Sequence, residues 1–325
     1  MDHCLPNIRH MRNGTAGAAT AMFTVGTLAG VSALVKDYPV YGGQAVRYLL
    51  AAVVLLAVTR ALGLRFVRLT PREWLLLGGL ALTGLAIFNV CVTESARASG
   101  PALVGTVLGA VPLALALAGG RPAPRLLVGA TVVVAGATLA AGLGSGTLTG
   151  LLWALGAFVG EISFSLMALP LLPKLGAIRV STYSTVLATP LLAAIGFARE
   201  GTGMLRVPTL AESLGFAYLA IVVTVGAFLL WYTALPKLGP GRAGLFAGLI
   251  PVGAIVTGLV LGLATPSGYD LLGAALVIAG ILVGLSADRT GKRAHVTAAD
   301  PVNRRSVPLD RARPRTEVGP SRAEP

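Results

Sequence analysis

One pattern that occurs twice constrains the fold of this chain more than any other feature. A Gly-Pro pair followed by two glycines and a proline lies within residues 100–112 and again within residues 239–251. Each of the five positions is displaced by 139 residues, without slippage. Residues 127–136 and 271–280 also resemble each other. A period of this length is too long for a solenoid and predicts two copies of one half-protein.

Composition places the chain in the membrane class. Of its 325 residues, 55% are hydrophobic and only 12% are charged, whereas about a quarter are charged in soluble domains. The mean hydropathy is +0.79. Apolar stretches near the ~20 residues that a bilayer-spanning helix needs follow one another, which predicts an all-α membrane protein of ten transmembrane helices. The expected helices are residues 13–35, 38–59, 74–93, 98–120, 126–141, 151–169, 180–198, 214–235, 241–263 and 271–287.

Five helices per repeat is an odd number, so the two repeats must cross the membrane in opposite directions, as an inverted-topology repeat. The distribution of Lys and Arg supports this. One set of alternate connections carries twelve of them, and the other carries only four. Both termini are therefore expected in the cytoplasm. The expected segments are a cytoplasmic N-terminal segment (1–13), a first repeat (14–142), a linker (143–150), a second repeat (151–287) and a disordered basic tail (288–325).

A charge inside the membrane is costly and marks a functional hypothesis by default, and three charged residues inside or at the end of predicted helices are candidates. Arg47 lies about one and a half turns into the second helix, and Glu94 closes the third helix on the same side. A structural ion pair between them is expected. Glu161 lies about twelve residues, or ~18 Å, into the sixth helix, near the midplane. It is either an acid that binds a proton or a cation, or a protonated structural Glu bonded to a neighbouring backbone.

Several uncharged residues are further candidates for binding a substrate or ion beside Glu161. Ser165 shares the helix face of Glu161. The others are Asn89, Thr93, Tyr183 and Trp231. Each of them is equally consistent with a satisfied contact between two helices.

Pro112 and Pro251 occupy matching places inside the fourth and ninth predicted helices. Proline removes one backbone hydrogen bond and tends to kink a helix. Two equivalent helix breaks in two halves indicate a central cavity in repeat transporters, although a harmless kink remains an alternative.

Other chemistry finds no support in the sequence. The three histidines (His3, His10 and His295) lie in the polar ends, so we expect no metal site. No Gly-rich loop ends in Gly-Lys-Ser/Thr, so we expect no nucleotide, and we expect no other cofactor and no catalytic residue. The net charge of +13 does not indicate nucleic acid, because nine of the 26 basic residues lie in the tail.

The chain resembles the drug/metabolite transporter superfamily, specifically its ten-helix members built from two EamA-type repeats. The features that carry the resemblance are the five-plus-five topology, the Pro39 to Arg47 spacing, the Gly-Pro turns at 100–112 and 239–251, and the Gly-x6-Gly patterns at 129–136 and 273–280. It departs from the family at Gly119 and Leu263, near which many members carry a Glu. The resemblance implies a substrate cavity among helices 1–4 and 6–9, with helices 5 and 10 peripheral, and export of metabolites, amino acids or drugs.

The sequence therefore predicts a secondary transporter in the cell membrane that works by alternating access, with proton coupling through Glu161. Its expected partners are a small-molecule substrate and the lipid bilayer, and a homodimer is left open. The alternative is a membrane protein that does not transport, either an enzyme acting on lipid-linked substrates or a sensor.

Overall fold

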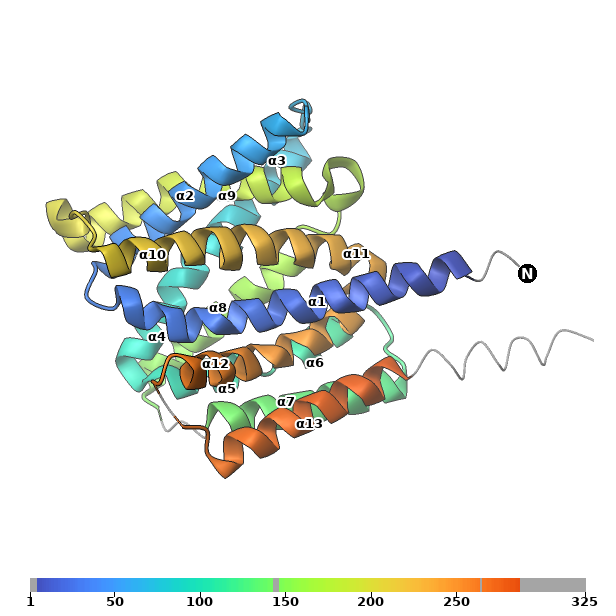
Figure 1. The fold of residues 1–325 in the computed structure, drawn as a ribbon. Coiled ribbons are helices and arrows are strands. Elements are labelled where there is room, and N and C mark those ends of the chain that lie inside the picture. Colours follow the sequence, from blue (N-terminus) through green and yellow to red (C-terminus); the bar gives the residue numbers. More distant parts are fainter. Residues whose placement is uncertain (1–4, 143–145, 264, 287–325) are drawn as a thin grey trace, which may run out of the picture. The chain divides into compact units, whose positions relative to one another are not determined.

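The computed structural model describes residues 5–142, 146–263 and 265–286 (Figure 1). The regular elements of these residues are all helical, which confirms the predicted class. The predicted basic tail, residues 288–325, lies outside the described residues, as does the first part of the predicted linker. The chain becomes helical at Leu5, within the segment expected to precede the first helix.

The two halves contain similar series of helical elements. The first half contains α1 (Leu5–Val31), η1 (Ser32–Val35), α2 (Val40–Ala61), α3 (Pro71–Gly79), η2 (Leu80–Ile87), α4 (Phe88–Ser99), α5 (Pro101–Leu108), α6 (Val111–Ala118) and α7 (Pro124–Ala141). The second contains α8 (Leu148–Leu166), α9 (Leu172–Glu200), η3 (Gly201–Met204), α10 (Leu210–Tyr218), η4 (Leu219–Gly226), α11 (Ala227–Leu245), η5 (Phe246–Gly248), α12 (Leu249–Val260) and α13 (Gly268–Leu285).

The described residues hold nine continuous apolar helical stretches long enough to cross a membrane. One of them, Leu210–Val260, has 51 residues, or ~77 Å at 1.5 Å per residue, against ~30 Å for a bilayer core. Gly239 breaks it with φ 75° and ψ 161°, a conformation that only glycine adopts readily. The stretch is therefore two crossings, and the described chain makes ten.

Local geometry repeats at the spacing found in the sequence. Gly100 has φ 79° and ψ 165°, nearly the values of Gly239. Each half also starts its third crossing with a capping box, in which a threonine and a glutamate satisfy each other's backbone N–H groups. These pairs are Thr70 with Glu73 and Thr209 with Glu212. The turns and helix starts of the two halves are thus set by the same local chemistry.

The third crossing of each half contains a π-helical segment in its middle. The first, η2, covers Leu80–Ile87, and the second, η4, covers Leu219–Gly226, so both ends are displaced by the same 139 residues. A π-helix is wider than an α-helix and is frequently found at functional sites. Because it recurs at the same place, we treat it as a property of the repeat.

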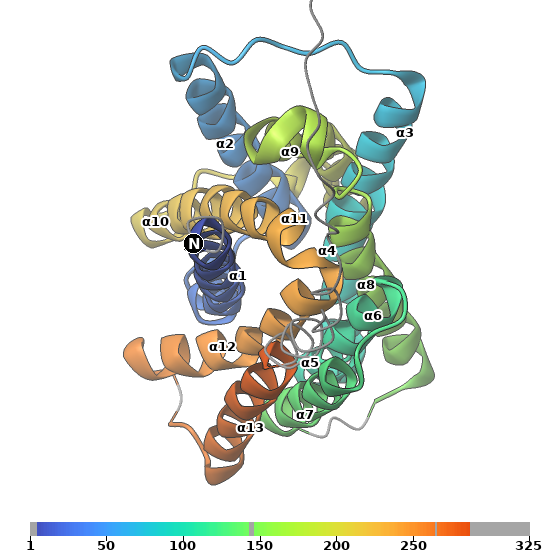
Figure 2. The same cartoon turned by 90° about the vertical axis from the view of Figure 1, so that its right-hand side faces the viewer.

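The last helices of the two halves, α7 and α13, pack side by side (Figures 1 and 2). A Cβ added to Gly129 would lie 2.7 Å from the carbonyl of Gly280, and one added to Gly136 would lie 2.7 Å from that of Gly273. These contacts are reciprocal, because Gly129 corresponds to Gly273 and Gly136 to Gly280. A reciprocal contact is the signature of a two-fold axis, as an inverted repeat requires.

The first helices of the two halves break this symmetry. On α1, a Cβ added to Gly26 would lie 2.1 Å from the carbonyl of Ile250 on α12. On α8, a Cβ added to Gly160 would instead lie 2.8 Å from the carbonyl of Thr83 in η2. The glycine face of α1 thus packs on the ninth crossing, whereas that of α8 packs on the third. The two halves share one fold but differ in how their helices are arranged.

Candidate functional site

A cavity lies between the two halves of the helix array. Residues of α1, α2, η2, α4, α8, η4 and α11 line it, which are the first, second, third, sixth and eighth crossings. Crossings four, seven and nine contribute no described lining residue, so fewer helices line the cavity than the resemblance implied. Helices α7 and α13 are peripheral, as expected. Apolar and aromatic side chains form most of the wall, among them Met22, Phe88, Phe164, Phe228 and Trp231.

Arg47 is the only cation among the described residues that line the cavity. It is 5% exposed. Its Nε donates to the hydroxyl of Thr224 at 2.9 Å, and one terminal nitrogen makes a long contact of 3.5 Å with the amide oxygen of Gln44. Its guanidinium also lies 5.5 Å from the ring centre of Tyr48. Within the described residues, Arg47 forms no ion pair.

The ion pair expected between Arg47 and Glu94 is not formed. Glu94 pairs with Arg97 at 3.4 Å and with Arg199 at 3.8 Å, and it accepts the hydroxyl of Tyr41. The end of α4 meets the first turn of α2, where Tyr41 lies. Arg47 comes six residues later, or ~9 Å further along the helix axis. The sequence placed both residues near one end of the bundle, but their depths differ.

Glu161 is the only acid in the lining, as far as the structure describes the chain. It accepts no hydrogen bond and forms no ion pair within the described part of the chain. The titratable groups within electrostatic range of it are the phenols of Tyr48 and Tyr232. Gly160 lets this turn of α8 approach the backbone of η2 closely. A charged carboxylate without a partner is costly in such surroundings, so Glu161 requires a proton or a bound cation.

Two more of the predicted candidates line the cavity. The amide nitrogen of Asn89 donates to the Tyr48 hydroxyl at 3.2 Å and to the carbonyl of Leu85 at 2.7 Å. Trp231 is 2% exposed, and its indole N–H has no hydrogen-bond partner among the described residues. The structure therefore brings Glu161, Asn89 and Trp231 to the same cavity as Arg47.

The remaining candidates lie elsewhere. Ser165 is buried away from the cavity lining, and its hydroxyl has no partner within the described chain. Thr93 is also absent from the lining. Tyr183 accepts the backbone N–H of Val67 at 3.2 Å and stacks on Phe66, with the ring centres 5.9 Å apart. Tyr183 thus binds the connection between α2 and α3 instead of facing the cavity.

The two prolines of the repeated pattern also lie outside the cavity lining. Pro112 is in the first turn of α6, after α5 has ended at Leu108. Pro251 is in the first turn of α12, which follows the short 3-10 helix η5. Proline suits a first turn because its missing N–H has no partner there.

Two lining residues, Tyr48 and Phe228, were not predicted as site residues, and neither was Thr224, which lies outside the lining. Thr224 contacts the lining residue Arg47 directly, and it carries the only hydroxyl of the apolar stretch 219–227. An isolated polar residue in an apolar helix was a signal that could have identified it. Tyr48 and Phe228 carried no such signal, because aromatic residues occur throughout membrane helices.

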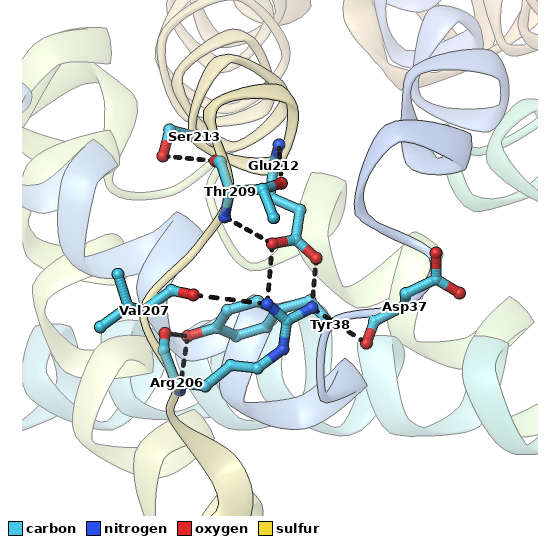
Figure 3. A network of polar contacts seen from close by, with 7 residues as sticks. All are labelled: Asp37, Tyr38, Arg206, Val207, Thr209, Glu212 and Ser213. Atoms are coloured by element: carbon cyan, nitrogen blue, oxygen red, sulfur yellow. Dashed lines mark hydrogen bonds and ion pairs between the residues drawn. The ribbon is translucent and has the colours of Figure 1, made fainter.

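A network of polar contacts holds one end of the helix array (Figure 3). Arg206 pairs with the Glu212 carboxylate through both terminal nitrogens, and one of them also donates to the carbonyl of Asp37 at 3.2 Å. The Tyr38 hydroxyl donates to the Arg206 carbonyl at 2.8 Å, and the guanidinium lies 4.9 Å from the Tyr38 ring centre. The hydrogen bond with Glu212 raises the pKa of Arg206 above its ordinary value. The network thus joins the connection before α2 to the start of α10.

The corresponding glutamate of the first half is bound in a similar way. Lys174 pairs with Glu73 at 2.7 Å and donates to the carbonyl of Arg68 at 3.2 Å. Here too a cation binds the capping-box glutamate at the start of the third crossing, but Lys174 comes from the other half of the chain, whereas Arg206 and Glu212 belong to the same half. In each half, an ion pair therefore fixes the start of the third crossing.

The arrangement is similar to known membrane proteins. Residues 146–285 match the EamA-like transporter family. The chain is 28% identical over 279 residues to the uncharacterized transporter YetK of Bacillus subtilis (strain 168), covering 82% of this chain and 84% of that protein. One crystal structure, at 20% identity, matches with a TM-score of 0.72 over 85% of this chain and 98% of the other, which shows a shared fold.

Proposed function

Because this chain is an EamA-type member of the drug/metabolite transporter superfamily, we propose that it is a secondary transporter of small zwitterionic molecules. It is a multi-pass membrane protein. The observation that carries the proposal is the presence of one cation and one acid in the lining of a single cavity, neither of them in an ion pair with any described residue. The transported molecule supplies the missing counter-charges.

The two charges have complementary roles. Arg47 presents terminal guanidinium nitrogens, which match the geometry of a carboxylate. Glu161 faces the cavity from the opposite half and binds an ammonium group. The aromatic and aliphatic wall between them, which includes Phe88 and Phe228, accepts an apolar side chain. A molecule without charges would leave both groups unpaired in a low-dielectric cavity, so it would bind poorly.

The broken symmetry of the two halves supports alternating access. An inverted repeat whose halves had the same arrangement would present the same opening to both sides of the membrane. In this chain, α1 packs on α12 through Gly26, whereas α8 packs on η2 through Gly160. If the two halves exchanged these packing arrangements, the cavity would become accessible from the other side of the membrane. Substrate binding must favour one arrangement in order to drive this change.

The proposal also covers the direction of transport and its coupling to protons. Glu161 either holds a proton or pairs with the substrate's ammonium group, so the inward movement of a proton drives the outward movement of a substrate. The excess of basic residues in alternate connections supports cytoplasmic termini and a location in the cell membrane. In Figure 1 the start of α1 and the end of α13 lie at the same end of the helix array, which agrees with an even number of crossings.

An enzymatic function has less support. Among the described residues, the cavity lining has a single carboxylate and no His, Cys or Ser. A hydrolase needs a nucleophile with an adjacent base or a second acid.

Flux into proteoliposomes tests the proposal. The panel contains amino acids with apolar side chains, each matched with the amine that lacks its carboxylate and with the acid that lacks its amino group. We expect flux of the amino acid, faster in the presence of a proton gradient, and much weaker flux of the two analogues. Equal flux of all three, or none of any, would contradict the proposal.

A further inference from the structure

The hydroxyl of Thr224 connects the π-helical segment of one half to the cation of the other half. It donates to the carbonyl of Leu219 at 3.0 Å and accepts the Nε–H of Arg47 at 2.9 Å. Thr224 is fully buried. A buried threonine hydroxyl has one hydrogen to donate and can also accept, so both functions of this group are used.

The helical register of η4 determines where this hydroxyl points. In α-helices of the chain, threonine hydroxyls donate to the carbonyl four residues earlier, as Thr59 does to Leu55 in α2 and Thr182 does to Ile178 in α9. Thr224 in η4 donates to a carbonyl five residues earlier, a spacing that matches the i→i+5 pattern of a π turn. Removing one residue from that turn would rotate the side chain by ~100° around the helix. The π register therefore aims the hydroxyl at Arg47.

We infer that Thr224 is a positioning residue for Arg47 and that it determines the preference of the cavity for a carboxylate. With Nε held by Thr224, the two terminal nitrogens form the face that remains for a ligand. One of them makes only the long contact with Gln44. A carboxylate binds such a pair of nitrogens through two parallel hydrogen bonds. This inference rests on the proposed function, since it assigns a cause to carboxylate recognition.

The first half shows that this hydroxyl is not required by the fold. The residue of η2 that corresponds to Thr224 is Leu85, yet η2 is π-helical over the same eight positions. The hydroxyl of Thr83 in η2 bonds within its own helix. The π-helix therefore forms without a hydroxyl at this position. The hydroxyl is present only in the half where it contacts Arg47.

The variants Thr224→Val and Thr224→Ser test the inference, with Thr83→Val as the matched control in the other π-helix. The first readout is the affinity of the purified full-length protein for an apolar amino acid and for its amine. A hydrogen bond to a charged group is worth enough that its loss weakens binding about tenfold or more. We expect that loss in Thr224→Val for the amino acid only, and affinities near wild type in Thr224→Ser and Thr83→Val. Equal weakening for both ligands, or none, would overturn the inference.

A second readout does not depend on the ligand. In protein with ¹⁵N-labelled arginine, the Nε–H of Arg47 should exchange slowly with water, because it is buried and bonded. Exchange should become faster in Thr224→Val and stay slow in Thr224→Ser. If wild type binds no amino acid, the proposed function fails, and this exchange still decides the role of Thr224. Unchanged exchange in Thr224→Val would refute positioning by the hydroxyl.

Discussion

Tyr41 donates its hydroxyl to the carboxylate of Glu94, and this hydrogen bond joins the first turn of α2 to the end of α4. Two arginines, Arg97 and Arg199, lie over the same tyrosine ring at 5.5 and 6.0 Å from its centre. Glu200 completes the cluster by accepting the backbone N–H of Tyr41 at 3.0 Å. Three helices from both halves therefore meet at one aromatic ring, and Arg47 takes no part.

Because Glu94 and Arg47 share no partner, their replacements should affect stability independently. We expect the effects of Glu94→Ala and Arg47→Ala on unfolding in detergent to add within about 0.5 kcal/mol in the double variant. A thermal or denaturant unfolding series of the two single variants and the double variant measures this. A coupling energy of about 1 kcal/mol or more between the two replacements would show that Arg47 and Glu94 do form the ion pair that the sequence predicted.

Replacement of Gly253 should disturb the contact between α1 and α12. A Cβ at this position would lie 2.1 Å from the carbonyl of Phe23, so Gly253→Ala must separate the helices, at a cost of about 1–3 kcal/mol for overpacking. Gly258→Ala on the same helix is the control, because a Cβ there meets nothing within 4 Å. We expect Gly253→Ala to lower the melting temperature and Gly258→Ala to leave it unchanged or raised. Similar melting temperatures for both variants would show that α1 and α12 are not held this closely.

Replacement of Arg206 should loosen the connection before α2. Arg206→Gln loses the ion pair with Glu212 and weakens the contact with Asp37, so hydrogen exchange in residues 36–39 should become at least roughly two- to fivefold faster, the effect of losing an ion pair at the surface. Lys36→Gln, a neighbouring exposed cation, serves as the control. Since the pKa of Arg206 is raised, its charge stabilises the fold at all pH values below its ordinary pKa and is lost only as pH rises through the folded value. The difference between variant and wild type should thus be constant between about pH 6 and 9. A difference that disappears within that range would contradict this role.

Replacement of Glu161 should separate transport from proton coupling. Glu161→Gln keeps the shape of the side chain and removes its charge, so we expect normal expression and a flux that no longer responds to a pH gradient. Glu161→Asp should keep part of the response. The groups facing Glu161, namely Tyr48 and Tyr232 with Arg47 across the cavity, stay in place in both variants. Flux with wild-type pH dependence in Glu161→Gln would make this residue a structural acid.

Labelling of single cysteines tests the orientation in the membrane. In a background without Cys4 and Cys91, an impermeant thiol reagent should label Thr265→Cys in intact cells and should reach Asn13→Cys only after permeabilisation. Both positions are exposed in the structure. The reverse pattern would invert the topology and with it the proposed direction of transport.

The sequence by itself determined the class, the ten crossings and the two-fold relation of the halves. These follow from local properties: apolar length, the glycine that breaks the chain at Gly239, and a spacing of 139 residues that η2 and η4 share. It also identified Glu161 and Arg47 as charges inside the membrane, because charge and depth along a single helix can be counted.

Only the tertiary structure decided which residues meet. Arg47 finds Thr224, 177 residues away, and Glu94 finds Tyr41 and Arg199 instead of Arg47. Depth along one helix does not give the rotation of that helix or its neighbour, and a π turn shifts every later side chain around the axis by ~100°. The asymmetric packing of α1 and α8 is equally invisible in two similar sequences, since it depends on which surface each glycine face meets.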